Sequence, residues 1–153
     1  MHAHALATAV LTAATLAVSG CGSGAQRDPA AAFNTDYAAQ SADLKAIGDQ
    51  ILAAIRGADR QTDAQVAASF GAIATRAHAG ADALAGLTPP GHAASQLAAL
   101  KAAVDKAAGD LDAITAAARA GDAAAATKAS QALVTDSIPI RDARAALDRV
   151  VRP

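Results

Sequence analysis

Residues 97–118 of this 153-residue chain read LAALKAAVDKAAGDLDAITAAA. Apolar positions recur there in alternating steps of three and four residues without a slip: Leu97, Leu100, Val104, Ala107, Leu111, Ile114 and Ala118. That spacing places all of these positions on one face of an α-helix, as in the seam between packed helices. The stretch therefore predicts a long amphipathic helix from about residue 89 to residue 120.

Three further amphipathic segments flank this helix. They run from about residue 33 to 56, from about 59 or 62 to 87, and from about 122 to 151. Gly57 and Gly121 are expected to end helices in the left-handed conformation. Thr62 with Gln65 matches a capping box, and Asp122 is a suitable N-cap for the fourth helix. The sequence TPPG at residues 88–91 separates the second helix from the third, because proline lacks the N–H that a continuing helix needs.

Pro139 lies inside the fourth segment. We expect a kink or a break there, since a proline within a helix removes a hydrogen bond and costs about 3 kcal/mol. Short connections between amphipathic helices favour an up-down arrangement with antiparallel neighbours. No run of alternating β-branched residues predicts a strand. We therefore expect an all-α, antiparallel four-helix bundle over residues 33–153 as the one folded domain.

The composition limits the classes of partner. The chain has 13 Lys and Arg against 14 Asp and Glu, for a net charge of −1, so it offers no basic surplus for nucleic acid and no polybasic run for an anionic membrane surface. Its single cysteine excludes an internal disulfide and a thiolate metal cage. Two Lys–Asp pairs are expected one turn apart on the solvent side of the third helix: Lys101 with Asp105, and Lys106 with Asp110.

The first thirty residues have the order of a secretory signal. An uncharged, largely apolar run extends from residue 6 to residue 18. It is too short for a good membrane span of about 20 residues, but it fits the apolar region of a signal peptide, about 7–15 residues long. The tetrapeptide VSGC at residues 18–21 resembles the lipobox of bacterial lipoproteins, in which an aliphatic and two small residues precede a cysteine. One departure is the start of the chain, which has two histidines where the family usually has Lys or Arg.

This resemblance implies that a diacylglycerol is attached to the Cys21 sulfur and that the chain is cleaved between Gly20 and Cys21. Residues 1–20 would be the signal peptide and residues 21–32 a lipidated, flexible tether, so the mature protein would be anchored on the extracytoplasmic face of the cell membrane. The alternatives are an ordinary secretory signal with an incidental cysteine, and a cytosolic protein. In its layout, and in its turns at residues 87–90 and 121–122, the chain resembles small all-helical actinobacterial lipoproteins, many of which have no known activity.

The sequence contains no recognisable catalytic pattern. It has no nucleophile elbow, phosphate loop, haem-attachment or zinc pattern, so we expect a non-enzymatic protein without a cofactor. The weak alternative is a metal site made by His78, Asp82 and His92, because an antiparallel hairpin could bring the end of the second helix near the start of the third. Exposed histidines beside a loop are the simpler interpretation.

Two other features suggest where a ligand could bind. Phe33, Tyr37 and Phe70 could meet at one end of the bundle, either as core or as the lining of an apolar pocket. Pro139, which lies between two isoleucines, could open a groove for a ligand or a partner helix, or it could be a tolerated kink. We expect a membrane-anchored interaction module that contacts another envelope protein. A bundle that binds a small ligand or a metal is the alternative.

Overall fold

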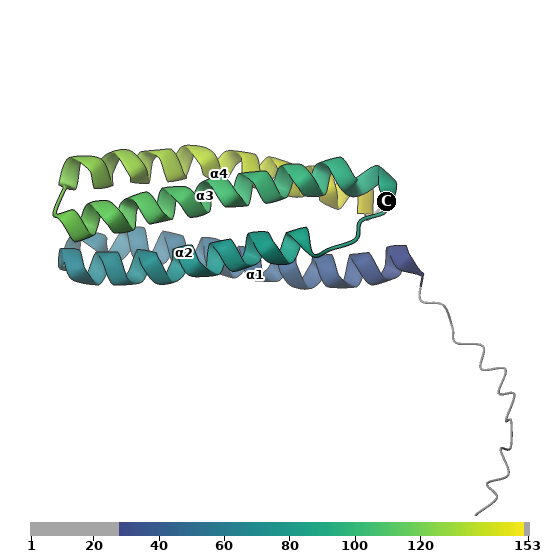
Figure 1. Cartoon of the computed structure of the whole chain (residues 1–153), viewed down its shortest axis with the longest axis horizontal. Helices are drawn as coiled ribbons and strands as arrows, with labels where there is room; N and C mark the ends of the chain where they lie inside the picture. The colour runs from purple at the N-terminus through teal and green to yellow at the C-terminus, as the bar shows by residue number, and fades with distance from the viewer. Residues whose placement is uncertain (1–27, 152–153) are drawn as a thin grey trace, which may run out of the picture.

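The protein is an all-α, four-helix bundle, as the sequence predicts. A computed structural model describes residues 28–151 (Figure 1). The elements follow one another in this order: α1 (Pro29–Gly57), the 3-10 turn η1 (Ala58–Arg60), α2 (Asp63–Ala85), the 3-10 turn η2 (Gly91–Ala93), α3 (Ala94–Ala120) and α4 (Ala123–Val151). The described part of the chain contains no strand. None of its helices combines the length and the apolar character that crossing a membrane requires.

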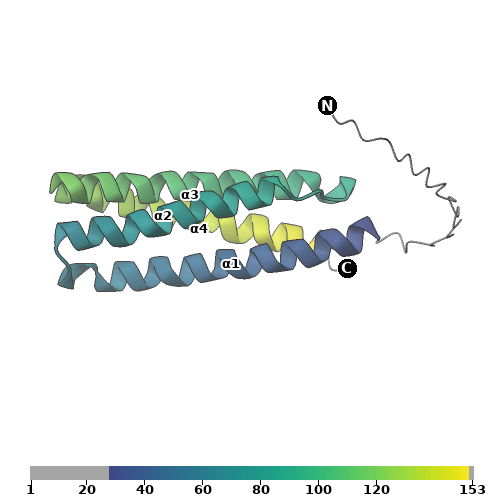
Figure 2. The ribbon, with the colours of Figure 1, turned by 60° about the horizontal axis from the view of Figure 1, so that its bottom comes forward.

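Helix α3 is central to the packing. Both α2 and α4 lie closely against α3 along its length, whereas α1 lies less closely on α2 and hardly approaches the backbone of α4. Figure 2 shows the reason: α4 starts beside α3 at the α3–α4 turn and runs towards α1 only near the C-terminal end. The bundle is therefore closed at the end where α1 begins, and α1 and α4 are spread apart at the other end.

The helix starts are fixed by local side-chain caps. Asp28 Oδ1 accepts a hydrogen bond from the Ala30 N–H at 3.0 Å, and Pro29 occupies the first helical position. Helix α1 therefore begins four residues earlier than expected, inside the segment assigned to the tether. The capping box predicted at Thr62 and Gln65 is confirmed, since each side chain accepts a hydrogen bond from the other residue's backbone N–H.

The two glycines expected to end helices behave differently. Gly121 has a φ of 66° in the left-handed region, and Asp122 then caps α4 by accepting a hydrogen bond from the Ala125 N–H at 2.9 Å, as predicted. The prediction for Gly57 is wrong, because its φ is −92°. At Gly57 the chain continues into η1 and needs no abrupt reversal, whereas only residues 121 and 122 connect α3 to α4.

The prolines also correct two expectations. Helix α3 does not begin at Pro89 but at Ala94, after the 3-10 turn η2. Of the kink or break expected at Pro139, the break does not occur, because helix α4 continues from Ala123 to Val151. Pro139 is exposed, so water can solvate the carbonyl group that its missing N–H would have bonded, while packed side chains on both sides hold the helix together.

The core is divided between two clusters along the bundle. All seven seam positions predicted in α3 are buried. At the closed end, Phe33 and Tyr37 stack with ring centroids 5.9 Å apart and pack with Leu147 of α4. Phe70 belongs to the other cluster, with Leu111 and residues of α2 and α4. The three aromatic side chains are core residues, but they do not meet as expected, because Phe70 lies near the start of α2, at the opposite end from the start of α1.

Candidate functional site

A groove lies between α1 and α4 where these helices separate. Its inner part has a volume of about 390 Å³, which falls in the range of about 300–1,000 Å³ typical of small-molecule sites. The walls are aliphatic side chains of α1 and α4, including Leu44, Ile51, Leu133 and Ile140. This is the region of Pro139 in which the sequence suggested a groove, although Pro139 itself does not line it.

The groove exists because alanines take the place of larger residues at its floor. Ala77 of α2 and Ala107 of α3 line it from below, beside Val104 and Leu111. These alanines are buried, and an alanine side chain leaves room that a leucine would fill. The cavity therefore reaches from the surface between α1 and α4 to the two helices on the far side of the core.

A second, wider hollow continues the groove towards the α3–α4 turn. It has a volume of about 730 Å³ and shares Ile55 and Val134 with the inner part. Its other apolar lining includes Val66 and Phe70. Because the two hollows share these residues, they form one continuous apolar surface, which we call the α1–α4 groove.

The rim of the α1–α4 groove carries exposed aliphatic side chains. Leu52 of α1 lines the groove with an exposed fraction of 55%, and Val134 of α4 faces it with 59%. Ile138, one turn beyond Val134, is 49% exposed. A contiguous apolar surface of this kind commonly marks a site of interaction. Sequence reasoning named Ile138 only as a neighbour of Pro139, and it placed neither Leu52 nor Val134 at a site, because these two residues lie outside the helical stripes from which the core was predicted.

Charges are separated along the groove. Lys45, Arg141 and Arg144 line its inner part, with Asp49 as the one acidic residue there. The wider hollow is lined instead by three acidic residues and no Lys or Arg: Asp59, Asp63 and Asp122. Lys45 Nζ lies 2.7 Å from Asp49 Oδ2, and this exposed pair is only weakly stabilising. The groove is thus cationic towards the closed end of the bundle and anionic towards the α3–α4 turn.

The closed end holds α1 against α4 through polar groups as well as the aromatic stack. Asn34 Nδ2 donates a hydrogen bond to the Val151 carbonyl oxygen at 3.1 Å. The Tyr37 side chain is 1% exposed, and burial, followed by the nearby Asp148 carboxylate, raises its pKa to about 12. The phenol therefore stays neutral at physiological pH. The hydrogen bond of Asn34 and the packing of Phe33 and Tyr37 with Leu147 join α1 to α4 at this end of the groove.

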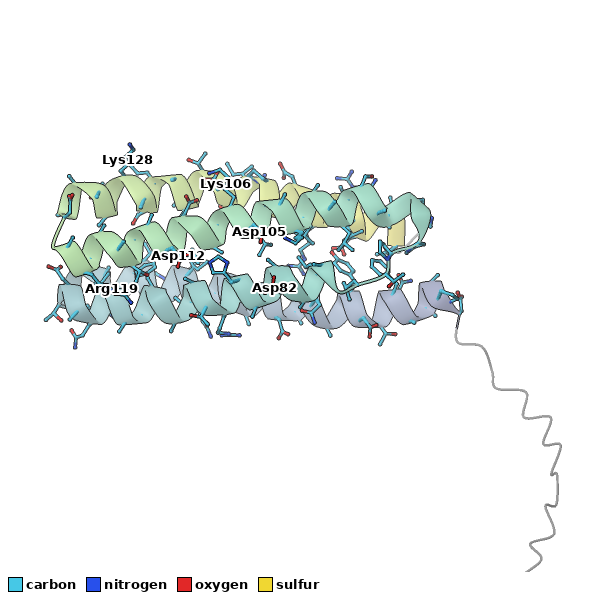
Figure 3. All side chains as sticks on the ribbon, viewed as in Figure 1. Asp82, Asp105, Lys106, Asp112, Arg119 and Lys128 are labelled. Carbon is cyan, nitrogen blue, oxygen red and sulfur yellow. The ribbon has the colours of Figure 1, made fainter. Side chains whose placement is uncertain are left out.

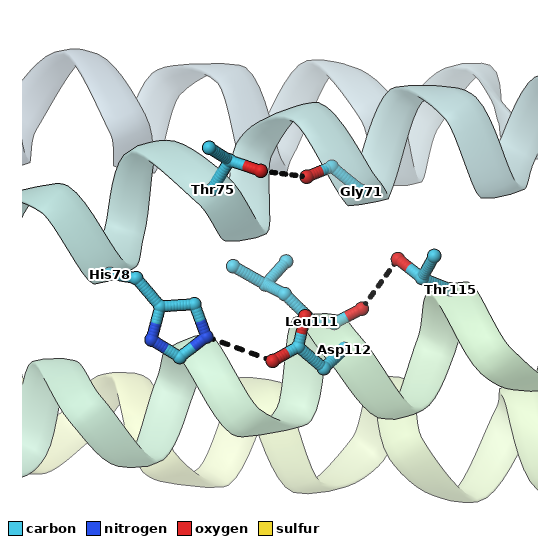
Figure 4. A network of polar contacts seen from close by, with 6 residues as sticks. All are labelled: Gly71, Thr75, His78, Leu111, Asp112 and Thr115. Atoms are coloured by element: carbon cyan, nitrogen blue, oxygen red, sulfur yellow. Dashed lines mark hydrogen bonds and ion pairs between the residues drawn. The ribbon is translucent and has the colours of Figure 1, made fainter.

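The residues of the weak metal alternative are not brought together. His78 Nε2 lies 2.8 Å from Asp112 Oδ2 of α3 (Figure 4), whereas His92 Nε2 lies 3.3 Å from the Val150 carbonyl oxygen. Figure 3 shows Asp82 further along α2 than the position that faces Asp112. Within residues 28–151, no group of three His, Cys, Asp or Glu side chains could hold a metal ion. His78 is two turns from the end of α2, so its side chain meets Asp112 of α3 and lies away from the connection that carries His92.

One of the two predicted Lys–Asp pairs of α3 forms, whereas the lysine of the other pairs with a residue of α4. Lys101 Nζ lies 2.5 Å from Asp105 Oδ2, as expected. Lys106 Nζ instead lies 2.5 Å from Asp136 of α4, and not at Asp110. Burial and the neighbouring Asp136 raise the pKa of Asp110, whereas hydrogen bonding to Lys106 lowers the pKa of Asp136. The three side chains form a polar contact between α3 and α4.

The residues proposed for lipid attachment and cleavage, Cys21 and Gly20, lie outside the described residues. The chain shows no match to a protein-family model, to a curated protein or to a solved structure. The α1–α4 groove is therefore the feature on which a functional proposal can be built.

Proposed function

We propose that this protein is a non-enzymatic interaction module of the bacterial envelope, anchored to the membrane by lipid on Cys21, and that it binds through the α1–α4 groove. The observation that carries the proposal is the groove itself, with a floor that reaches the core and with Leu52 and Val134 exposed at its rim. Exposed aliphatic side chains around an apolar hollow gain free energy when a ligand or partner removes them from water.

The proposed anchor agrees with the position of the groove. Residues 22–28 separate Cys21 from α1, and even a fully extended chain of this length spans at most about 25 Å. The bundle would therefore stay close to the membrane, with its closed end, where α1 begins, nearest to the anchor. The groove would remain free to bind along the side of the bundle.

The anchor is tested by replacing Cys21. Intact-mass analysis of the membrane-fraction protein should show loss of residues 1–20 and addition of acyl groups. Cys21→Ser should prevent both and release the protein from membranes, and the variant Ser23→Ala in the neighbouring tether is the matched control. Unchanged maturation and membrane retention of Cys21→Ser would contradict the anchor.

The groove is tested separately by site-specific photo-crosslinking in cells. A photoreactive amino acid replaces Leu52 at the rim, and the control places it at Ala98, an exposed position of α3 outside the groove. We expect a recurrent adduct, identified by mass spectrometry, at position 52 alone. The same adducts at both positions, or none at position 52, would contradict a binding role for the groove.

A further inference from the structure

We propose that the inner part of the α1–α4 groove binds one fatty acid, with its aliphatic chain over Ala77 and Ala107 and its carboxylate at Arg141 and Arg144, beside Lys45. This assignment rests on the proposed function, because it names the ligand class of the same groove. It depends on three properties of the described residues: the shape of the hollow, its lining and the sign of the charges at its end.

The shape favours a chain over a protein segment. A helix with its side chains is about 10–12 Å across, whereas the inner hollow occupies about 390 Å³ and has two buried alanines in its lining. A second copy of this protein would present the same concave surface, and two concave surfaces leave each other unfilled. A single aliphatic chain is thin enough to enter between α1 and α4 and to reach Val104 and Leu111.

The lining favours an aliphatic ligand over an aromatic or polar one. The walls and floor are leucine, isoleucine, valine and alanine side chains, and the inner hollow contains no aromatic residue to stack on a ring. An aliphatic ligand in this open groove removes the apolar lining from water, which is favourable in proportion to the area buried. Ser137 is the one hydroxyl-bearing residue of the lining, so most of the ligand must be without hydrogen-bonding groups.

The charges determine the head group and its direction. Lys45, Arg141 and Arg144 outnumber Asp49 around the inner hollow, and Asp49 lies 2.7 Å from Lys45, so the two arginines carry the surplus positive charge. Both arginines lie in the C-terminal half of α4, which runs to the closed end of the bundle. Arg141 is exposed and its partner Asp142 is the next residue in the chain, so its guanidinium can turn to a carboxylate at little cost. Three acidic residues line the far hollow, so the carboxylate binds at Arg141 and the chain runs towards Ile55.

The experiment is calorimetric titration of the mature chain from residue 21 with Cys21→Ser, which prevents the protein's own acyl groups from competing. Dodecanoate should bind with one-to-one stoichiometry. Dodecyltrimethylammonium, which has the same chain and a cationic head, should bind at least about tenfold more weakly. Butanoate, which has the carboxylate without the chain, should give no measurable binding.

Two variants locate the ligand. Ala107→Leu should abolish binding of dodecanoate because its side chain occupies the floor of the hollow where the aliphatic chain would lie, and helical circular dichroism of the variant checks that the fold is kept. Arg141→Gln should weaken binding of dodecanoate by roughly tenfold. The matched control is Lys128→Gln, at a side chain of α4 that points away from the bundle (Figure 3).

The outcomes are distinct. No binding of dodecanoate, or binding that Ala107→Leu leaves unchanged, overturns the fatty-acid site. Equal affinity for the cationic amphiphile overturns the assignment of the head group. If dodecanoate fails to bind while the crosslinker at position 52 captures a protein, the groove keeps its proposed binding role and only the fatty-acid inference fails.

Discussion

Two neighbouring alanines of α3 should respond in opposite ways to the same substitution. Ala107 and Ala108 are both buried, with exposed fractions of 4% and 0%. Ala107 lines the α1–α4 groove, whereas Ala108 lines neither of its two hollows. A leucine at position 107 enters empty space, and a leucine at position 108 must displace packed atoms.

The expected size follows from the three carbon atoms that leucine adds to alanine. Their burial contributes about 0.8 kcal/mol each, or about 2.4 kcal/mol together. Ordering the leucine side chain costs about 0.5–1 kcal/mol. Ala107→Leu should therefore raise the free energy of unfolding by about 1.5 kcal/mol. Ala108→Leu should lower it by about 1–3 kcal/mol, the usual effect of overpacking a filled core.

Urea unfolding, followed by the helical circular dichroism signal, measures both changes against the parent protein. The comparison controls for the helix propensity of leucine, because both substitutions lie in the middle of α3. If Ala107→Leu destabilises the protein as much as Ala108→Leu does, the groove is not an open space in solution, and both the binding role and the fatty-acid site lose their structural basis.

Three further predictions concern the turn at Gly121, the partly buried Asp110 and the buried Tyr37. Gly121→Ala should lower the free energy of unfolding by about 1 kcal/mol, because φ is 66° at this position. Gly109→Ala, at a helical position with open space around it, should raise the free energy of unfolding by about 0.5–1 kcal/mol. Melting temperatures of the two variants that shift in the same direction would contradict this prediction. The raised pKa of Asp110 means that its charged carboxylate opposes folding at neutral pH. Asp110→Asn should therefore increase the free energy of unfolding at pH 7 by less than about 1 kcal/mol, and the gain should disappear below about pH 4, where the carboxyl group is protonated in both states. A variant that is less stable than the parent at pH 7 would show that neighbouring groups compensate the charge of Asp110. Tyr37 is the only tyrosine, and its folded-state pKa of about 12 lies above the ordinary 10.0, so the free energy of unfolding falls as the pH rises above 10. Ultraviolet titration should show tyrosinate forming near pH 12 or together with loss of helix. A titration midpoint near pH 10 in the intact helical protein would be inconsistent with burial of the phenol.

Features that depend on neighbours in the chain could be predicted from sequence. The seam of α3, the capping box at Thr62 and the left-handed Gly121 all involve residues within four positions of one another or a repeat of the helical period. These interactions form in the same way whichever helix lies opposite. Gly57 shows the limit of this reasoning, because the same residue type that reverses the chain at 121 leads into a 3-10 turn at 57.

The candidate site could be predicted only in part. Pro139 and its flanking isoleucines pointed to the correct side of α4, since Ile140 lines the groove. The opposite wall on α1 could not be found, because the sequence does not state how closely two helices approach or at what angle they cross. The exposed Leu52 and Val134 break the helical stripes, and this irregularity is the one sequence signal that could have indicated them.

The sequence by itself determined that the chain forms four amphipathic helices, where all four end and where α2 and α4 begin, to within about two residues, and which face of α3 is buried. The tertiary structure decided which side chains meet across helices, such as Lys106 with Asp136 and His78 with Asp112, and it placed Phe70 in a different core cluster from Phe33 and Tyr37. It also decided that α1 and α4 separate to leave the groove. The physical reason is that helix formation follows from bonds and periodicity within one segment, whereas the spacing of two helices depends on the combined volume of every side chain packed between them.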